Sequence, residues 1–165
     1  MKKLLLLIIL PTLLFVSCST PYQEVGTDVR GGYSFERKSQ NIFNVLFEGN
    51  GFTTPQKASD FAILRAAEVT LEHQFKYFTK LGKKDISTSR EIDTGGYATT
   101  TGTVSSYGTY TSNTTYTPSS TTIYQPGYLI IIQCYTSKPS GHVGKIYDAK
   151  SVQMQLRTQY KLNSL

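Results

Sequence analysis

Apolar and polar residues alternate in several stretches of the chain and predict the strands of a small sheet. Residues 33–48 alternate apolar and polar side chains around Phe43 and Phe47, which is the period of a strand with one buried face. Residues 76–81 predict a further strand. The stretch 127–136 is almost continuously apolar. It therefore predicts a central strand that is covered on both faces.

The pattern changes to a helical period between residues 55 and 75. Thr54 can cap the first turn and Pro55 suits the first helical position, so both favour a helix that begins here. The large apolar residues that fall on one stripe of this helix are Phe61, Leu64, Leu71 and Phe75. Burial of this stripe predicts a helix that packs on one face of the sheet.

The C-terminal segment, residues 149–161, fits two periods. Asp148 could cap a helix, and the Gln, Met, Arg and Lys residues that follow favour a helix. The residues from Val152 to Tyr160 also alternate as in a strand. We expect the helix and keep the strand as the alternative.

Residues 94–126 contain no charged residue and are rich in Thr, Ser, Tyr and Gly. They have too few large aliphatic side chains to offset the entropy of ordering in a core. We expect a low-complexity insertion that is disordered or loosely ordered. One alternative is β-hairpins, which Thr and Tyr favour. The other is an adhesive surface for sugars, formed by Tyr97, Tyr107, Tyr110, Tyr116 and Tyr124.

The first seventeen residues have the layout of an export signal: two lysines, an apolar run over 4–16, and then small residues. A membrane span is the alternative, but it needs about 20 apolar residues. The sequence Leu-Phe-Val-Ser-Cys that ends at Cys18 resembles the lipobox of bacterial lipoproteins, with Phe15 where Leu is usual. This resemblance implies removal of residues 1–17 and acylation of Cys18. Cleavage elsewhere, with Cys18 incidental, is the alternative.

The residue after the cysteine bears on the destination of the chain. Lipoproteins of this type that stay in the inner membrane usually carry Asp there, whereas this chain has Ser19. The resemblance therefore implies an outer-membrane protein that faces the periplasm, held by more than one acyl chain. The polar residues 18–32 predict a tether. A core would follow, formed by residues 33–93 and 127–165.

Composition excludes several classes of function. The chain has 17 Lys and Arg against 11 Asp and Glu, a net charge of +6 that falls to +4 when residues 1–17, with their two lysines, are removed. This mild excess suits anionic lipid or a cell-wall polymer and is too dilute to indicate nucleic acid. Two cysteines cannot form a disulfide framework, and no Cys/His cluster has zinc spacing. Cys134, inside an apolar run, predicts a small buried side chain. We expect no metal and no cofactor.

Only a few of the charged residues and histidines are candidates for catalysis, and each has a structural explanation or lacks a catalytic partner. Arg65 and Glu68 lie one turn apart on the predicted helix, and we expect a structural ion pair rather than an acid–base pair. Asp148 is explained by capping. His73 and His142 have no visible nucleophile or carboxylate relation. We therefore expect no catalytic residue.

Several short stretches together resemble the CC0125/CC1285 family of bacterial lipoproteins. They are Gly32-Tyr33-Ser34, the strand end Phe47-Glu48-Gly49-Asn50, the helical Leu64-Arg65-Ala66-Ala67-Glu68 and, near the end, Tyr147-Asp148-Ala149. The match covers residues 32–81 well and leaves out the Thr/Tyr-rich segment. The resemblance implies an N-terminal lipid anchor and a small α+β domain, and it brings no established activity.

Taken together, these observations predict an α+β fold with a single sheet of three to five strands and one or two helices on one face. The function that we expect is that of a non-enzymatic, lipid-anchored outer-membrane protein that binds or scaffolds an envelope protein. One alternative is a peptidoglycan- or carbohydrate-binding module that uses the tyrosines of residues 94–126. A hydrolase that uses Glu68, Asp148 or a histidine is the less favoured alternative.

Overall fold

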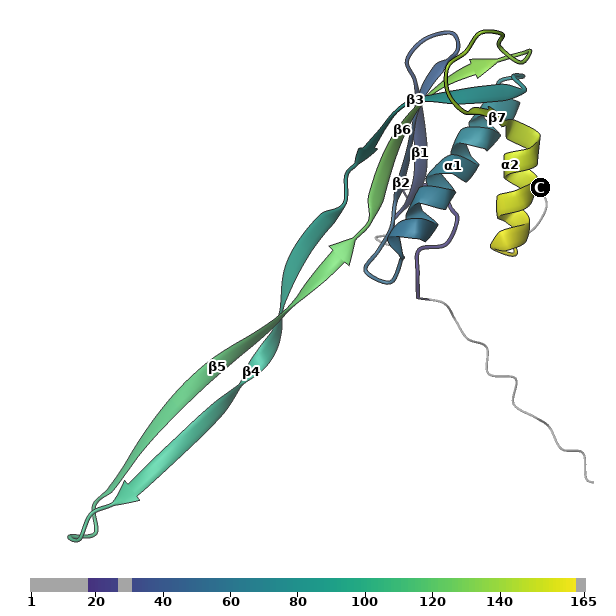
Figure 1. The fold of residues 1–165 in the computed structure, drawn as a ribbon. Helices are drawn as coiled ribbons and strands as arrows, with labels where there is room; N and C mark the ends of the chain where they lie inside the picture. Colours follow the sequence, from purple (N-terminus) through teal and green to yellow (C-terminus); the bar gives the residue numbers. More distant parts are fainter. Residues whose placement is uncertain (1–17, 27–30, 163–165) are drawn as a thin grey trace, which may run out of the picture.

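The computed structural model describes residues 18–26 and 31–162. The predicted signal peptide, residues 1–17, lies outside the described residues. In chain order the elements are β1 (Gly32–Arg37), β2 (Ile42–Glu48), α1 (Pro55–Glu72), β3 (Tyr77–Asp85), β4 (Thr88–Val104), β5 (Tyr110–Gln125), β6 (Gly127–Tyr135), β7 (Ile146–Asp148) and α2 (Ala149–Gln159). Five strands form one sheet in the order β1-β2-β6-β3-β7, while β4 and β5 form a separate two-stranded sheet (Figure 1). The predicted small sheet with two helices is confirmed.

The five-stranded sheet is antiparallel throughout and has β6 at its centre. Residues 33–48, where we predicted strand structure, form the hairpin of β1 and β2, with Tyr33 opposite Phe47. The strand predicted at 76–81 is β3, which begins at Tyr77 and continues through a bulge to Asp85. None of the helices within 18–26 and 31–162 is long and apolar enough to cross a membrane.

The helices cover one face of this sheet (Figure 1). On that face the β6 side chains Ile130 and Ile132 are fully buried, whereas Leu129 and Ile131 on the opposite face are only partly buried. The prediction that this strand is covered on both faces is therefore wrong. An apolar run shows only that a strand is apolar, and here the second face retains contact with solvent.

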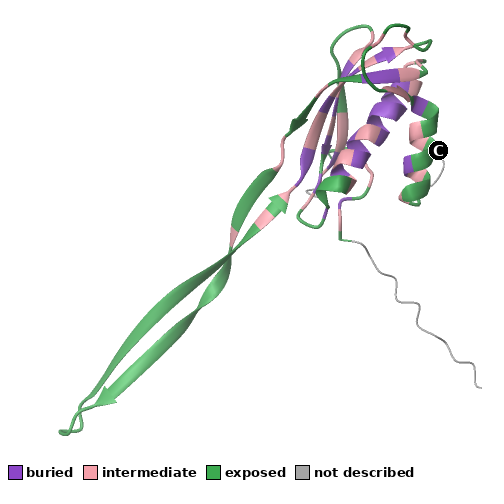
Figure 2. Ribbon diagram, viewed as in Figure 1, coloured by how far each residue is buried: buried purple, intermediate pink, exposed green. Residues whose placement is uncertain are grey.

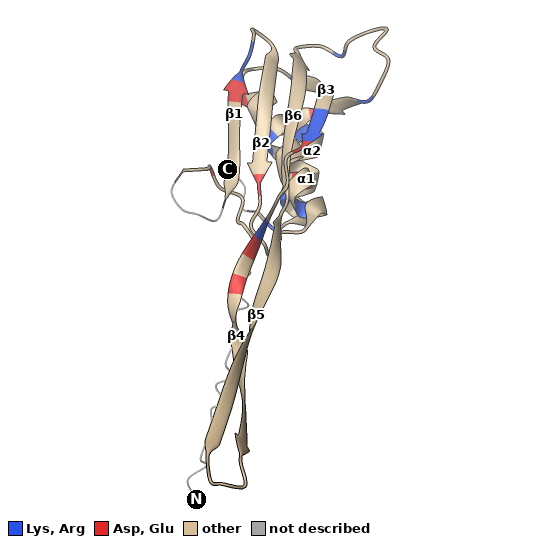
Figure 3. Cartoon of the chain, turned by 90° about the vertical axis from the view of Figure 1, so that its left-hand side faces the viewer, with Lys and Arg blue, Asp and Glu red and all other residues tan. Residues whose placement is uncertain are grey.

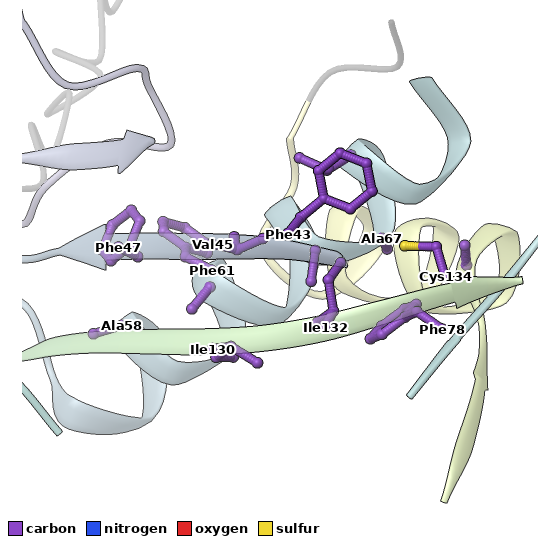
Figure 4. Close-up of a cluster of buried hydrophobic side chains, with 14 residues drawn as sticks. Phe43, Val45, Phe47, Ala58, Phe61, Ala67, Phe78, Ile130, Ile132 and Cys134 are labelled. Atoms are coloured by element: carbon purple, nitrogen blue, oxygen red, sulfur yellow. The ribbon is translucent and has the colours of Figure 1, made fainter. Parts of the chain in front are cut away.

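Helix α1 begins where the sequence predicted it. Thr54 caps the helix by accepting a hydrogen bond from the Lys57 amide at 3.2 Å, and Pro55 occupies the first turn. Small alanines on the inner surface are fully buried and allow the helix to approach the sheet closely: Ala58, Ala62, Ala66 and Ala67. Phe61 packs among them on the aromatic and aliphatic side chains of β2 and β6 (Figure 4).

Helix α2 settles the ambiguity at the C-terminus. Asp148 caps it by accepting a hydrogen bond from the Ser151 amide at 2.8 Å. The alternating strand reading of this segment is therefore wrong, because the cap and the helix-forming residues decide the structure. The helix lies beside α1 and completes the helical layer (Figure 1).

The largest departure from expectation is the segment 94–126, which we expected to be disordered or loosely ordered. Its residues form most of the long antiparallel hairpin of β4 and β5, joined by a turn at 105–109 (Figures 1 and 2). We call residues 88–125 the hairpin arm. Nearly all of its residues are exposed, so pairing between strands orders it in place of burial in a core. The hairpin alternative fits the structure.

Candidate functional site

The segment that follows the predicted lipidation site packs on the domain. Thr20 is fully buried: its amide donates to the Thr53 Oγ1 at 3.0 Å, and its hydroxyl accepts from the Asn50 amide at 2.7 Å. The Asn50 side chain also donates from Nδ2 to the carbonyl of Cys18 at 2.9 Å. Residues 18–32 were predicted to form a polar tether, but the part of that segment around Thr20 packs on the domain instead. Cys18 itself is exposed.

Tyr22 continues this attachment into the helical layer. Its ring centroid lies 5.2 Å from that of Phe61 and 4.6 Å from that of Tyr33. Its hydroxyl donates a hydrogen bond to a carboxylate oxygen of Glu68. Burial, and then the adjacent Glu68 carboxylate, raise the pKa of Tyr22 far above its usual value. The hydroxyl therefore remains a hydrogen-bond donor at neutral pH.

Glu68 is the centre of a buried ion cluster. Its side chain is only 3% exposed, and it lies 3.3 Å from the Arg65 Nη1 and 2.6 Å from the Arg157 Nη2. Arg65 also binds Glu72, with Nη1 at 2.6 Å from Oε1. The predicted Arg65–Glu68 ion pair is present. Both Glu68 oxygens are engaged, which makes the residue a structural link between α1, α2 and the leader.

Sequence reasoning missed two members of this cluster, Tyr22 and Arg157. They are 46 and 89 residues from Glu68 along the chain, so no local spacing connects them. The only available signal was that a carboxylate on the apolar side of the predicted helix needs charged or polar partners. That signal indicates that Glu68 needs partners, but it does not identify them.

The other residues considered for catalysis have structural surroundings. Asp148 caps α2, and the backbone hydrogen bond from Ser151 lowers its pKa. The His73 Nδ1 lies 2.9 Å from the Val69 carbonyl oxygen. Cys134 is 1% exposed, and burial raises its pKa, as expected of a small buried thiol. Within residues 18–26 and 31–162, no group of three or more His, Cys, Asp or Glu could hold a metal ion.

The five tyrosines proposed as an adhesive surface do not form one surface. Tyr107 lies in the turn at the tip and is 95% exposed, while Tyr124 lies near the base, where it lines a shallow pocket with Phe52 and Arg90. Tyr97 alternates onto one face of the arm. Tyr110 and Tyr116 fall on the other face.

Tyr110 and Tyr116 each cover a glycine of the opposite strand. A Cβ on Gly102 would lie 2.3 Å from the Tyr110 hydroxyl oxygen, and a Cβ on Gly96 would lie 2.7 Å from the Tyr116 Cζ. Each ring thus occupies the space that a side chain on β4 would need. Such aromatic cover of strand glycines stabilises an antiparallel pair that has no core beneath it. We call this the tyrosine face of the arm.

The opposite face of the arm is formed by threonines. Cross-strand pairs place side chains directly opposite one another. On this face they are Thr99 with Thr115, Thr101 with Asn113, and Thr103 with Thr111. Charged residues occur on the arm only near its base, at Arg90, Glu91 and Asp93 (Figure 3). Most of the arm therefore presents hydroxyls and aromatic rings without charge.

The base of the arm and the leader meet at the same loop. A Cβ on Gly51 would lie 2.4 Å from the Ile123 Cγ2, so the loop 49–53 touches β5 directly. The same loop holds the carbonyl of Cys18 through Asn50. The predicted anchor point and the arm therefore belong to one end of the domain, the end at which α1 begins (Figure 1).

Comparison with known proteins adds no relative. No protein-family model, no curated protein and no solved structure matches this chain. Membership of the CC0125/CC1285 family therefore stays a prediction from the residues that resemble it.

Proposed function

We propose that the protein is a non-enzymatic lipoprotein, anchored through acyl chains on Cys18 to the outer membrane and facing the periplasm. The hairpin arm is its binding or scaffolding element for a component of the envelope. The observation that carries this proposal is the shared loop 49–53, which fixes the residue to be acylated and touches the base of the arm.

This arrangement gives the anchor a mechanical role. Thr20 is buried on the domain only two residues after Cys18, so acyl chains at Cys18 would hold the domain close to the membrane with little slack. A strand rises about 3.3 Å per residue. The 16 residues of β5 therefore extend the arm by roughly 50 Å from the anchored end. An arm of this length reaches neighbours well beyond the domain itself.

The anchor is tested by replacing the acylated residue. Cys18→Ala is expected to abolish incorporation of labelled fatty acid and to leave an unprocessed chain, because the thiol that receives the lipid is gone. Cys134→Ala is the matched control, since it removes the other cysteine from the buried core. Fatty acid on the Cys18→Ala chain, or none on the parent, would contradict the anchor.

The role of the arm is tested by shortening it. Replacing residues 94–119 with Asn-Gly joins Asp93 to Ser120, which are partners in the hairpin, through a tight turn. The domain is expected to unfold at an unchanged temperature, while in-cell crosslinking loses the envelope component that the parent captures. Capture of the same component by both chains would place the binding surface on the domain.

A second candidate function is binding of a cell-wall glycan, supported by the placement of Tyr110 and Tyr116. Rings that cover backbone glycines hold their outer surfaces toward solvent, and such surfaces stack on sugar rings. If this is the function, Tyr110→Ala with Tyr116→Ala would remove retention on purified peptidoglycan. Tyr97→Ala, on the opposite face, would retain it. Equal retention of the parent and both variants would contradict a role of the Tyr110 and Tyr116 rings in glycan binding.

A further inference from the structure

The hairpin arm is an isolated pair of strands, and its outer edges are open. Within residues 18–26 and 31–162, β4 and β5 pair only with one another. A two-stranded hairpin that buries no apolar face is marginally stable in water, and a third or fourth strand is what usually completes it. An added strand would therefore stabilise the arm.

The hydrogen bond that closes the turn shows which groups of β4 point outward. The Ser105 amide donates to the Thr109 carbonyl at 2.9 Å, so this pair bonds across the hairpin. Bonded and non-bonded pairs alternate in an antiparallel ladder. Residues 99, 101 and 103 then bond to β5, and the residues between them direct N–H and C=O groups away from it. These outward residues are Gly96, Ala98, Thr100, Gly102 and Val104.

The position of Pro118 is consistent with this alternation, and it makes the edge of β5 different from the edge of β4. It lies opposite Gly96, at a position where its missing N–H faces outward from β5. The edge of β5 is thus interrupted, whereas β4 has no proline from Thr88 to Val104. Proline and charged side chains, especially Lys, commonly protect edge strands from pairing. The edge of β4 over 96–104 has none of these.

We propose that this edge of β4 pairs antiparallel with the same edge of a second copy of the chain, centred on Thr100. A two-fold axis there places Gly96 opposite Val104, Ala98 opposite Gly102, and Thr100 opposite Thr100 across the two copies. Each outward residue exchanges backbone hydrogen bonds with its counterpart. The product is a four-stranded sheet in the order β5-β4-β4-β5.

Charge and shape on the tyrosine face suit a second copy. Residues 94–126 carry no charge, so two arms meet without like-charge repulsion. The residues along the proposed seam are small apart from Val104, which is 69% exposed. In the paired arms Val104 of one copy lies opposite Gly96 of the other, beside the Tyr116 ring that covers it. Apolar surface that is exposed in the single arm is buried there.

Disulfide crosslinking of the purified full-length chain tests this register. In a background of Cys18→Ser, Thr100→Cys is expected to give a disulfide-linked dimer under mild oxidation. Directly opposed residues of a bonded pair have Cα atoms about 5.5 Å apart, which suits a disulfide. Thr103→Cys is the matched control, because its two copies lie six residues out of register. Equal dimer from both variants, or none from Thr100→Cys, would overturn the proposal.

Proline scanning tests the edge independently of cysteine. Ala98→Pro removes an outward N–H from β4, whereas Ser112→Pro removes an outward N–H from β5, and neither N–H bonds within the hairpin. Sedimentation should show self-association weakened about tenfold or more by Ala98→Pro, since two hydrogen bonds are lost per dimer. Ser112→Pro should leave it unchanged. Weaker self-association in Ser112→Pro than in Ala98→Pro, or a parent chain that stays monomeric, would overturn the proposal. All of these chains also carry Cys18→Ser, so failure of the proposed lipid anchor does not affect the result.

Discussion

At the scale of single residues, Glu68 shows how one carboxylate organises distant parts of the chain. It receives Arg65 from its own helix, Arg157 from α2 and Tyr22 from the leader. Burial of such a group costs free energy unless its partners are all in place. The cluster therefore makes the docking of the leader and of α2 interdependent.

Replacing Glu68 with Gln is expected to lower the free energy of unfolding by about 3 kcal/mol, because buried Arg65 and partly buried Arg157 lose their shared carboxylate. Chemical denaturation measures this loss. Glu36→Gln is the control, since it removes an exposed ion pair with Lys38. That change is expected to cost less than about 1 kcal/mol. Similar losses for the two variants would show that the Glu68 cluster contributes no more than a surface pair.

Tyr160 makes a second partly buried hydrogen bond to a carboxylate, and this one predicts how stability depends on pH. Its hydroxyl donates to Asp60 Oδ2 at 2.7 Å, and burial followed by this hydrogen bond raises its pKa from 10.0 to about 12. A raised folded-state pKa means that the contribution to stability is complete below pH 10 and is lost as the pH rises toward 12. Unfolding titrations of the parent should show this decrease. Tyr160→Phe should show a smaller one, and an equal decrease would contradict the assignment.

At the scale of elements, local signals and non-local pairing contribute differently. The start of α1 follows from Thr54 and Pro55, and the cap of α2 follows from Asp148, so both helices were predictable from neighbouring residues. The hairpin arm was not, because its order depends on the pairing of residues far apart, such as Tyr97 with Thr117. Apolar periodicity, the main signal used, is absent from a ribbon that buries no core. The composition of the arm gave only β-propensity.

The glycines under the tyrosine rings give a prediction for the arm alone. Gly102→Val places a Cβ within 2.3 Å of the Tyr110 hydroxyl oxygen and displaces that ring. We expect hydrogen exchange of the arm amides to accelerate about tenfold, consistent with a local loss of 1–2 kcal/mol on overpacking. Thr99→Val, on the threonine face of the arm, is the isosteric control. Unchanged exchange in Gly102→Val would show that the ring contributes nothing to pairing.

At the scale of the whole molecule, the fold divides into a packed domain and a projecting arm (Figure 2). The domain has a buried core and a sealed ion cluster, while the arm offers exposed hydroxyls, rings and backbone edges. The loop 49–53 joins these parts to the leader. A change in that loop should therefore loosen the leader while it leaves the stability of the core nearly unchanged.

Asn50→Ala combined with Thr53→Ala removes the side chains that hold Cys18 and Thr20. We expect limited proteolysis to cut the leader faster, because two hydrogen bonds that close it against the domain are lost. The melting temperature of the core should change little. Gln56→Ala, in the first turn of α1, is the control. Equal rates of cleavage would show that the contacts left in place, such as those of Tyr22 and of the Thr20 hydroxyl, are enough to hold the leader.

The absence of charge over residues 94–126 also has a kinetic consequence. Long-range electrostatic steering accelerates many protein encounters, and added salt slows those encounters. The uncharged part of the arm gains no such acceleration, so its association rates should lie near the unsteered range of about 10⁵–10⁶ M⁻¹ s⁻¹ and change little with ionic strength. Confinement of the anchored chains to a two-dimensional surface would then set how often arms meet.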